Sequence, residues 1–191
     1  MRSWNRGARR PTLIALAAVF VATAQAAEEP PLPPVAACAS APIACVEARR
    51  STLRLNEGTR RLSWKWSARD VVDIRDLSNP VVGRAGYDLC VYDAAGALAM
   101  AAGVPPRTVC DGVPCWRARP WGYEYRDRGA GSFGITKIAI KAAAGRTDRI
   151  KLAAEGDLLP LPVTPPASPL TVQLVRTDDP TVCWTAAVTP R

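Results

Sequence analysis

The chain has 191 residues, with 25 Lys and Arg against 17 Asp and Glu, for a formal charge of +8, and it contains no histidine. Without histidine, the Ser-His-Asp and Cys-His catalytic arrangements are excluded, and the commonest side-chain ligand of transition metals is missing. The remaining side chains restrict the accessible chemistry to carboxylates, lysine bases and calcium.

The first 26 residues have the pattern of a secretory signal peptide. The stretch "MRSWNRGARR" is basic, the run "TLIALAAVFVA" at 12–22 is apolar and uncharged, and Ala24 and Ala26 occupy the A-x-A positions of a cleavage site. We expect cleavage after Ala26; the alternative, an N-terminal membrane anchor, is disfavoured because the apolar run is short. No later run is long enough to span a membrane. The mature form is therefore predicted to be secreted, periplasmic or extracellular and to lack a transmembrane segment.

Removal of the signal lowers the formal charge from +8 to +4, because residues 1–26 carry four arginines and no acid. This mild excess is not the strong bias typical of a nucleic-acid-binding protein, so no nucleic-acid partner is expected. The next segment, 27–37 ("AEEPPLPPVAA"), is acidic and proline-rich and predicts an extended, solvated lead-in. Residues 38–191 are expected to form a single domain.

Alternation of apolar and polar residues predicts short strands along most of this domain. It runs through 51–57, 61–67, 87–93 and 97–102, and two further strands are expected around Pro120 within 115–127. Two hairpins are predicted, one joining 135–143 to 149–155 and one joining 170–177 to 181–188. Nine or ten short strands indicate an all-β fold, an antiparallel β-sandwich or jelly-roll-like architecture. The proline-rich loop 158–169 is expected to cross an edge or end of the sheets.

The six cysteines of this exported chain predict three disulfides. Six cysteines allow fifteen pairings, and we expect the two that are closest in sequence to pair locally. The predicted bonds are Cys38–Cys45, Cys110–Cys115 and Cys90–Cys183.

The stretch "CDGVPCW" at 110–116 admits a redox pair, a metal knuckle or a structural disulfide. A thioredoxin-like pair has two intervening residues at a helix N-terminus, whereas here four residues intervene and include the turn-forming Asp-Gly pair and a proline. A zinc knuckle needs two further ligands at similar spacing, and the sequence has no second such pair. The pattern therefore favours a disulfide across a hairpin tip.

Six motifs in order resemble a family of exported bacterial β-domains. They are "LSWKW" (62–66), "YDLCVYDAAG" (87–96), "CDGVPCW" (110–116), "GITKIAIKAA" (134–143), "LLPLP" (158–162) and "TVCWTA" (181–186). The resemblance covers the chain from Cys45 to Arg191. It implies a secreted or cell-envelope all-β domain with paired cysteines, and it assigns no functional residue.

Paired carboxylates, as in a glycosidase, are one catalytic arrangement that the composition leaves open. Glu124 lies between two tyrosines in an expected strand, Glu155 and Asp157 lie in a turn, and Asp88 and Asp93 bracket a strand. None has an evidently apolar setting that would raise its pKa, as a general acid requires, so solvated positions are favoured. The chain is therefore predicted not to be an enzyme. The alternative is a small carboxylate-based extracellular hydrolase that acts on polysaccharide.

Calcium is the one metal for which the sequence offers candidate ligands. Asp70, Asp73 and Asp76 recur at three-residue intervals, followed by Asn79, but the spacing and the missing glycine differ from an EF-hand. Aspartates that cap turns give the same pattern. No other metal and no cofactor is indicated.

Aromatic and basic residues suggest a binding surface. Trp64, Trp66 and Trp184 share faces with aliphatic residues and are expected in the core. Trp116 and Trp121 suit the core and an exposed platform equally. Basic residues at alternate positions would form a patch if their strands are neighbours, and otherwise make the polar face of an ordinary sheet. The candidate surface comprises Trp116, Trp121, Arg117, Arg119, Tyr123 and Tyr125, with further basic pairs at Arg126 and Arg128, Lys137 and Lys141, and Arg149 and Lys151.

These observations favour a secreted, non-catalytic β-sandwich module. Its expected partner is a polysaccharide or an acidic envelope glycan, and a structural role in the cell envelope is also compatible with the sequence. Carboxylates paired in a cleft would point instead to the hydrolase.

Overall fold

The computed structural model describes residues 35–69, 72–142 and 147–191. The predicted signal peptide, residues 1–26, lies outside the described residues, and so do residues 27–34 of the lead-in, Asp70, and residues 145–146 of the predicted turn.

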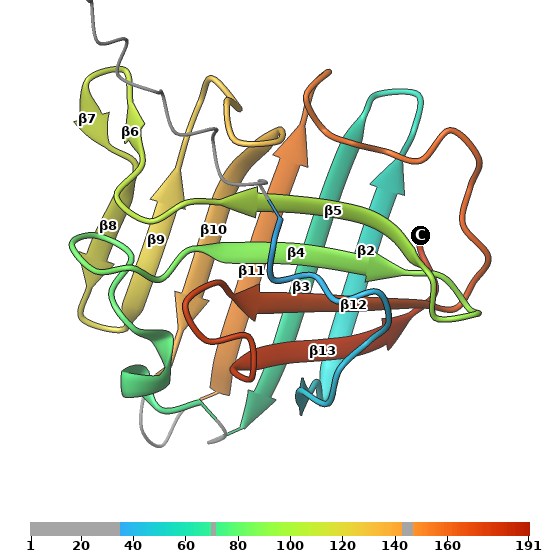
Figure 1. Ribbon diagram of the computed structural model, residues 1–191, viewed down its shortest axis with the longest axis horizontal. Coiled ribbons are helices and arrows are strands. Elements are labelled where there is room, and N and C mark those ends of the chain that lie inside the picture. Colours follow the sequence, from blue (N-terminus) through green and yellow to red (C-terminus); the bar gives the residue numbers. More distant parts are fainter. Residues whose placement is uncertain (1–34, 70–71, 143–146) are drawn as a thin grey trace, which may run out of the picture. The chain divides into compact units, whose positions relative to one another are not determined.

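Two antiparallel sheets form the domain (Figure 1), which confirms the predicted all-β sandwich. The larger sheet has the order β2-β3-β11-β10-β9-β8, with β2 Arg50–Asn56, β3 Arg61–Arg69, β11 Thr147–Glu155, β10 Ile135–Lys141, β9 Gly122–Arg126 and β8 Trp116–Arg119. The smaller sheet has the order β1-β13-β12-β4-β5, with β1 Val46–Glu47, β13 Cys183–Val188, β12 Leu170–Arg176, β4 Tyr87–Tyr92 and β5 Leu98–Val104. Only β1 pairs in parallel among the described strands.

The predicted strand pattern is confirmed. Ten of the described strands have four or more residues, and β1, β6 (Val109–Cys110) and β7 (Val113–Pro114) have two each. The hairpins β10–β11 and β12–β13 pair as expected. The one described helix is a single 3-10 turn, η1 (Ile74–Leu77). The loop 158–169 links β11 of the six-stranded sheet to β12 of the five-stranded sheet and buries Leu159, as expected for a segment that crosses the end of the sandwich.

The core lies between the two sheets, and in Figure 1 the strands β4, β5, β12 and β13 run across the strands behind them. In β3, buried Leu62, Trp64 and Trp66 alternate with residues that face outward, which is the period of a strand with one covered face. Trp66 donates its indole N–H to the carbonyl of Thr185 at 3.0 Å, so one buried tryptophan joins the two sheets. The predicted core positions of Trp64, Trp66 and Trp184 are confirmed, since each is at most 1% exposed.

The outer face of the five-stranded sheet is covered by residues 35–45, which we call the strap (blue in Figure 1). Its ends are fixed by disulfides, Cys38 to Cys90 of β4 and Cys45 to Cys183 of β13. Between them, the backbone of Ile43 exchanges two hydrogen bonds with the side-chain amide of Gln173. The strap begins in a turn and buries Ala37, so the end of the segment expected to be extended and solvated packs against the sheet instead.

The predicted bonds Cys38–Cys45 and Cys90–Cys183 are wrong. Strand β12 lies between β4 and β13, so Cys90 and Cys183 are separated by two strand spacings, at least about 9–10 Å, and are also offset by two residues along the strands. A disulfide does not bridge Cα atoms more than about 7 Å apart. The strap crosses all three strands and brings one cysteine to each of the outer two.

The predicted Cys110–Cys115 disulfide is confirmed, with 5.4 Å between the two Cα atoms. It closes the tip formed by β6 and β7, whose turn residues Asp111 and Gly112 both have positive φ. An Asp-Gly pair is the usual sequence for such a turn, because both positions require the left-handed region.

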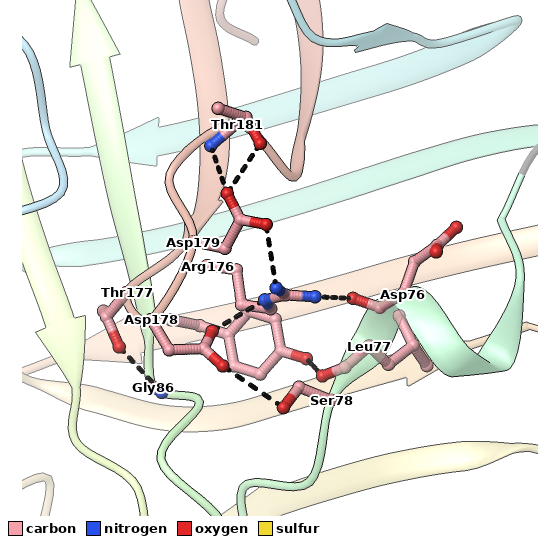
Figure 2. A network of polar contacts seen from close by, with 10 residues as sticks. Asp76, Leu77, Ser78, Gly86, Arg176, Thr177, Asp178, Asp179 and Thr181 are labelled. Carbon is pink, nitrogen blue, oxygen red and sulfur yellow. Dashed lines mark hydrogen bonds and ion pairs between the residues drawn. The ribbon is translucent and has the colours of Figure 1, made fainter.

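A polar network fixes η1 against the β12–β13 hairpin (Figure 2). Arg176, nearly buried, donates to the carboxylates of Asp178 and Asp179 and to the carbonyl oxygen of Asp76. Asp179 also accepts two hydrogen bonds from Thr181, which are the main cause of its lowered pKa. These carboxylates are engaged in holding the hairpin and the 3-10 turn together.

All six cysteines are bonded in pairs, which is typical of a protein in an oxidising compartment. Within the part of the chain that the structure describes, no helix is both long and apolar enough to cross a membrane.

Candidate functional site

The outer face of the six-stranded sheet carries an unusual density of positive charge, and we call its outward-facing residues the basic face. Strands β2, β3 and β11 alternate inward residues with outward ones that are mostly polar. Two carboxylates, Glu124 and Glu155, point outward on these strands. The outward cations are Arg50, Arg54, Arg61, Lys65, Arg69, Arg117, Arg119, Arg126, Lys137, Lys141, Arg149 and Lys151. This set includes all four lysines of the sequence.

Strand register places like charges directly opposite one another on this face. Lys65 is opposite Lys151 across β3 and β11, and Lys141 is opposite Arg149 across β10 and β11. Lys137 is opposite Arg126 across β10 and β9. Like charges in directly opposed positions destabilise a sheet, whereas alternating signs would stabilise it. The directly opposed like charges of the basic face therefore carry an electrostatic cost to folding.

Acidic partners neutralise only part of the face. Glu124 forms ion pairs of 2.8 Å with both Arg119 and Arg126. Its burial acts to raise its pKa, but the hydrogen bonds and charges of these two arginines outweigh burial and lower it. Glu155 pairs with Arg61 at 3.1 Å.

Apart from Arg61, the outward cations of β2, β3 and β11 have no carboxylate partner among the described residues. A shallow groove of about 360 Å³ lies there, lined by Arg50, Thr52, Lys65, Ser67, Arg149 and Lys151, among others. A second hollow of about 240 Å³ adjoins it and shares Arg50, Ser67 and Arg149. Guanidinium forks, ammonium groups and hydroxyls are donors suited to sulfate, phosphate or carboxylate groups.

Two residues of the predicted aromatic surface, Trp116 and Tyr125, are buried, so that part of the prediction is wrong. Trp116 is 1% exposed and Tyr125 is fully buried. The Trp116 ring packs between Tyr125 and Tyr87, with centroids 5.2 and 5.5 Å away, and its indole N–H donates to the carbonyl of Pro105 at 3.0 Å. The two residues face each other across β8 and β9 on the inner side of the sheet, where the core supplies apolar contacts.

The other four predicted surface residues have more exposed positions. Arg117 and Arg119 are exposed and share the outer face, as the alternation predicted. Trp121 is partly exposed, and the ammonium of Lys141 lies 4.2 Å from its ring centroid. Tyr123 is half-buried against the core.

The predicted basic pairs lie on neighbouring strands, as a patch requires. Strands β8, β9, β10 and β11 are consecutive in the sheet, and they bring Arg126, Lys137, Lys141, Arg149 and Lys151 onto the outer face. Arg128 follows the end of β9 and lines a neighbouring hollow of about 560 Å³.

Asp88 differs from the expectation for the carboxylates. Burial beneath the strap raises its pKa to about 6, although the backbone N–H of Ala37 donates to it at 3.1 Å and opposes that shift. The side chain is thus covered by the strap. Asp93, by contrast, accepts hydrogen bonds from the backbone of Ala95 and Ala97 in a turn.

The two described aspartates of the calcium pattern act as caps. Asp73 caps η1 and pairs with Arg75, whose hydrogen bonds are the main cause of the lowering of its pKa to about 2. Asp76 accepts the backbone N–H of Asp73 at 3.3 Å. The third, Asp70, lies outside the described residues, and among those described no three His, Cys, Asp or Glu side chains are grouped as metal ligands.

Comparison of the chain with protein-family models, with curated proteins and with solved structures finds no match. The resemblance drawn from the ordered motifs therefore remains a prediction.

Sequence reasoning missed Arg50, Arg54, Lys65 and Arg69 as part of the site. The signal is present, because each occupies the polar phase of an alternating strand. What the sequence does not show is that β3 pairs with β11, which joins two basic hairpins into one surface.

Proposed function

We propose that this protein is a secreted, non-catalytic β-sandwich module that binds an acidic polysaccharide through the basic face. The main support is the set of directly opposed like charges, Lys65 with Lys151, Lys141 with Arg149, and Arg126 with Lys137. An anionic ligand that bridges such pairs converts repulsion into attraction, so it gains affinity from charges that cost stability in its absence.

The shape of the face favours a polymer over a small molecule. Binding sites for small ligands are concave and mostly apolar, with a few polar groups. Here the cations spread over six strands, and the groove between β2, β3 and β11 is shallow and lined largely by polar side chains. A chain that carries repeated negative groups can contact many of these cations together.

Export is the second part of the proposal. Three disulfides are consistent with an oxidising compartment, and the N-terminal pattern of a basic segment, an apolar run and an A-x-A site is that of a secretory signal.

The test is binding of the oxidised protein to three immobilised polymers, namely heparin (sulfated), polygalacturonate (carboxylated) and dextran (neutral). We expect binding to one or both acidic polymers, none to dextran, and loss of affinity on raising the salt concentration. The double variant Lys65→Glu/Lys151→Glu should lose at least tenfold in affinity. Arg84→Glu, which changes an exposed arginine away from the basic face, is the control and should bind as the parent does. Equal binding by all three proteins would refute the proposal.

A further inference from the structure

Resting on the proposed function, we propose that the polysaccharide lies across the strands along one row of the basic face and packs a sugar ring on Trp121. The row, which we call the cross-strand row, consists of Arg50, Ser67, Arg149, Lys141 and Arg119.

The row follows from the register of the sheet. Arg50 is opposite Ser67, Ser67 is opposite Arg149, and Arg149 is opposite Lys141. The next position, on β9, is Gly122, and Arg119 lies opposite it on β8. The six strands are separated by five spacings of about 4.8 Å, so the row extends about 24 Å.

The position on β9 is restricted to glycine. Gly122 has a φ of +137°, and a Cβ there would lie 2.2 Å from the carbonyl oxygen of Ile140. The row therefore has no side chain of its own between Lys141 and Arg119, where Gly122 is buried and follows Trp121 in the chain.

Two features distinguish this row from the adjacent row through Lys65 and Lys151. First, Arg50, Ser67 and Arg149 line both hollows at this end of the face. Second, the adjacent row contains the carboxylate of Glu124 as one of its positions, and the cross-strand row does not.

A third row runs from Arg54 through Lys137 to Arg126. Its cations are separated by Ser63 and Ala153, so two consecutive strands supply no charge there. The cross-strand row has one hydroxyl at the corresponding point and no carboxylate at any of its own positions, although its last cation, Arg119, is paired with Glu124 of the adjacent row. With four cations against three in each neighbouring row, it is the path along which an anionic chain meets the most cations.

Trp121 supplies the part of the site that recognises a ring. It lies at the β8–β9 connection, partly exposed, with Lys141 of the row against its face at 4.2 Å. An indole beside a cation offers apolar contact and charge together, which suits a sugar ring that carries an acidic group. A polymer without rings would use the cations and not the indole.

The experiment measures heparin affinity for matched double variants, each of which removes two charges. Arg50→Gln/Arg149→Gln alters the cross-strand row, and Arg54→Gln/Lys137→Gln alters the third row. We expect at least a tenfold loss for the first variant and less than threefold for the second. Circular dichroism checks that both are folded, and Arg50→Lys/Arg149→Lys should restore most of the affinity.

The ring is tested with Trp121→Ala against two polyanions. This variant should weaken binding of heparin several-fold and leave binding of linear polyphosphate, which has no rings, unchanged. Equal weakening for both polymers, or for neither, overturns the role of Trp121. A polygalacturonate arm separates carboxylate from sulfate recognition, and single-stranded DNA that binds as tightly as heparin would identify a general polyanion surface and overturn the inference.

The outcomes separate the two proposals. If both double variants weaken heparin binding equally, the cross-strand row is wrong and the proposed function stands. If the parent binds neither acidic polymer, or if binding withstands Lys65→Glu/Lys151→Glu as well as both glutamine double variants, the proposed function itself fails.

Discussion

The two outer faces of the sandwich have opposite characters. The strap covers the outer face of the five-stranded sheet and buries Ala37, Tyr92 and Val175 beneath or beside two disulfides. The outer face of the six-stranded sheet has twelve outward cations and two carboxylates on its strands. One face is thus built for stability, and the other retains charges that oppose stability. The proposed function gives these charges a role, because an acidic ligand would contact them.

The strap disulfides should contribute most to the stability of the covered face, and more than the hairpin disulfide contributes. Cys45–Cys183 closes 138 residues and Cys110–Cys115 closes 5. In the chain-entropy model, removal of the first costs about 5 kcal/mol and removal of the second about 2 kcal/mol. Urea unfolding of Cys45→Ala/Cys183→Ala and Cys110→Ala/Cys115→Ala measures both losses. Equal losses would contradict the assignment of stability to the strap.

Asp88 makes the covered face sensitive to pH. Its pKa in the folded protein, about 6, lies above the ordinary value of 3.8, so its stabilising contribution is complete below pH 4 and is lost as the pH rises through 6. Asp88→Asn keeps an acceptor for the N–H of Ala37 and carries no charge. We expect it to raise the free energy of unfolding by about 2–3 kcal/mol at pH 7.5, because one pKa unit corresponds to about 1.4 kcal/mol.

At pH 3.5 the Asp88→Asn variant and the parent should unfold at the same urea concentration. An equal gain at both pH values would show that the effect does not arise from ionisation of Asp88.

On the basic face, stability and binding should change in opposite directions. Lys151→Glu replaces a like-charge pair with Lys65 by an opposite-charge pair, and the free energy of unfolding should rise by about 0.5–1 kcal/mol. Affinity for heparin should fall at the same time. Arg54→Glu is the matched control, because Arg54 lies opposite Ser63, so no like-charge pair is removed and no comparable gain in stability is expected. If Lys151→Glu gains stability and its affinity for heparin is unchanged, the basic face is an ordinary solvated surface and not a binding site.

Of the changes considered, the salt concentration should have the smallest effect on the free energy of unfolding. Screening weakens repulsion between exposed charges, so raising the concentration of sodium chloride should stabilise the parent by a few tenths of a kcal/mol more than it stabilises Lys151→Glu. Thermal unfolding of both proteins at low and high salt measures this difference, and an identical salt response would argue against repulsion across β3 and β11.

The sequence predicts what depends on local pattern. Alternation identified the strands, placed Trp64 and Trp66 in the core, and put Arg117 and Arg119 on one face, because the two-residue period is a property of each strand alone. The Asp-Gly turn identified the Cys110–Cys115 hairpin for the same reason.

The sequence does not predict the features that depend on strand order or on packing against segments that are distant in the chain. The insertion of β12 between β4 and β13 decides the disulfide partners, and the strap decides the pKa of Asp88. Trp116 and Trp121 are five residues apart in similar contexts, yet one packs between two tyrosines of the core and the other lies partly exposed beside Lys141. The pairing of β3 with β11, which is remote in sequence, turns separate basic strands into one face.

Acetylation of the lysines with and without polysaccharide tests the central claim most directly, because all four lysines lie on the basic face. Mass spectrometry would report the acetylation rate of each. With saturating heparin, we predict strong protection of Lys141, Lys151 and Lys65 and weaker protection of Lys137, and dextran should protect none. Unchanged rates at all four lysines, under conditions where heparin is bound, would contradict the account.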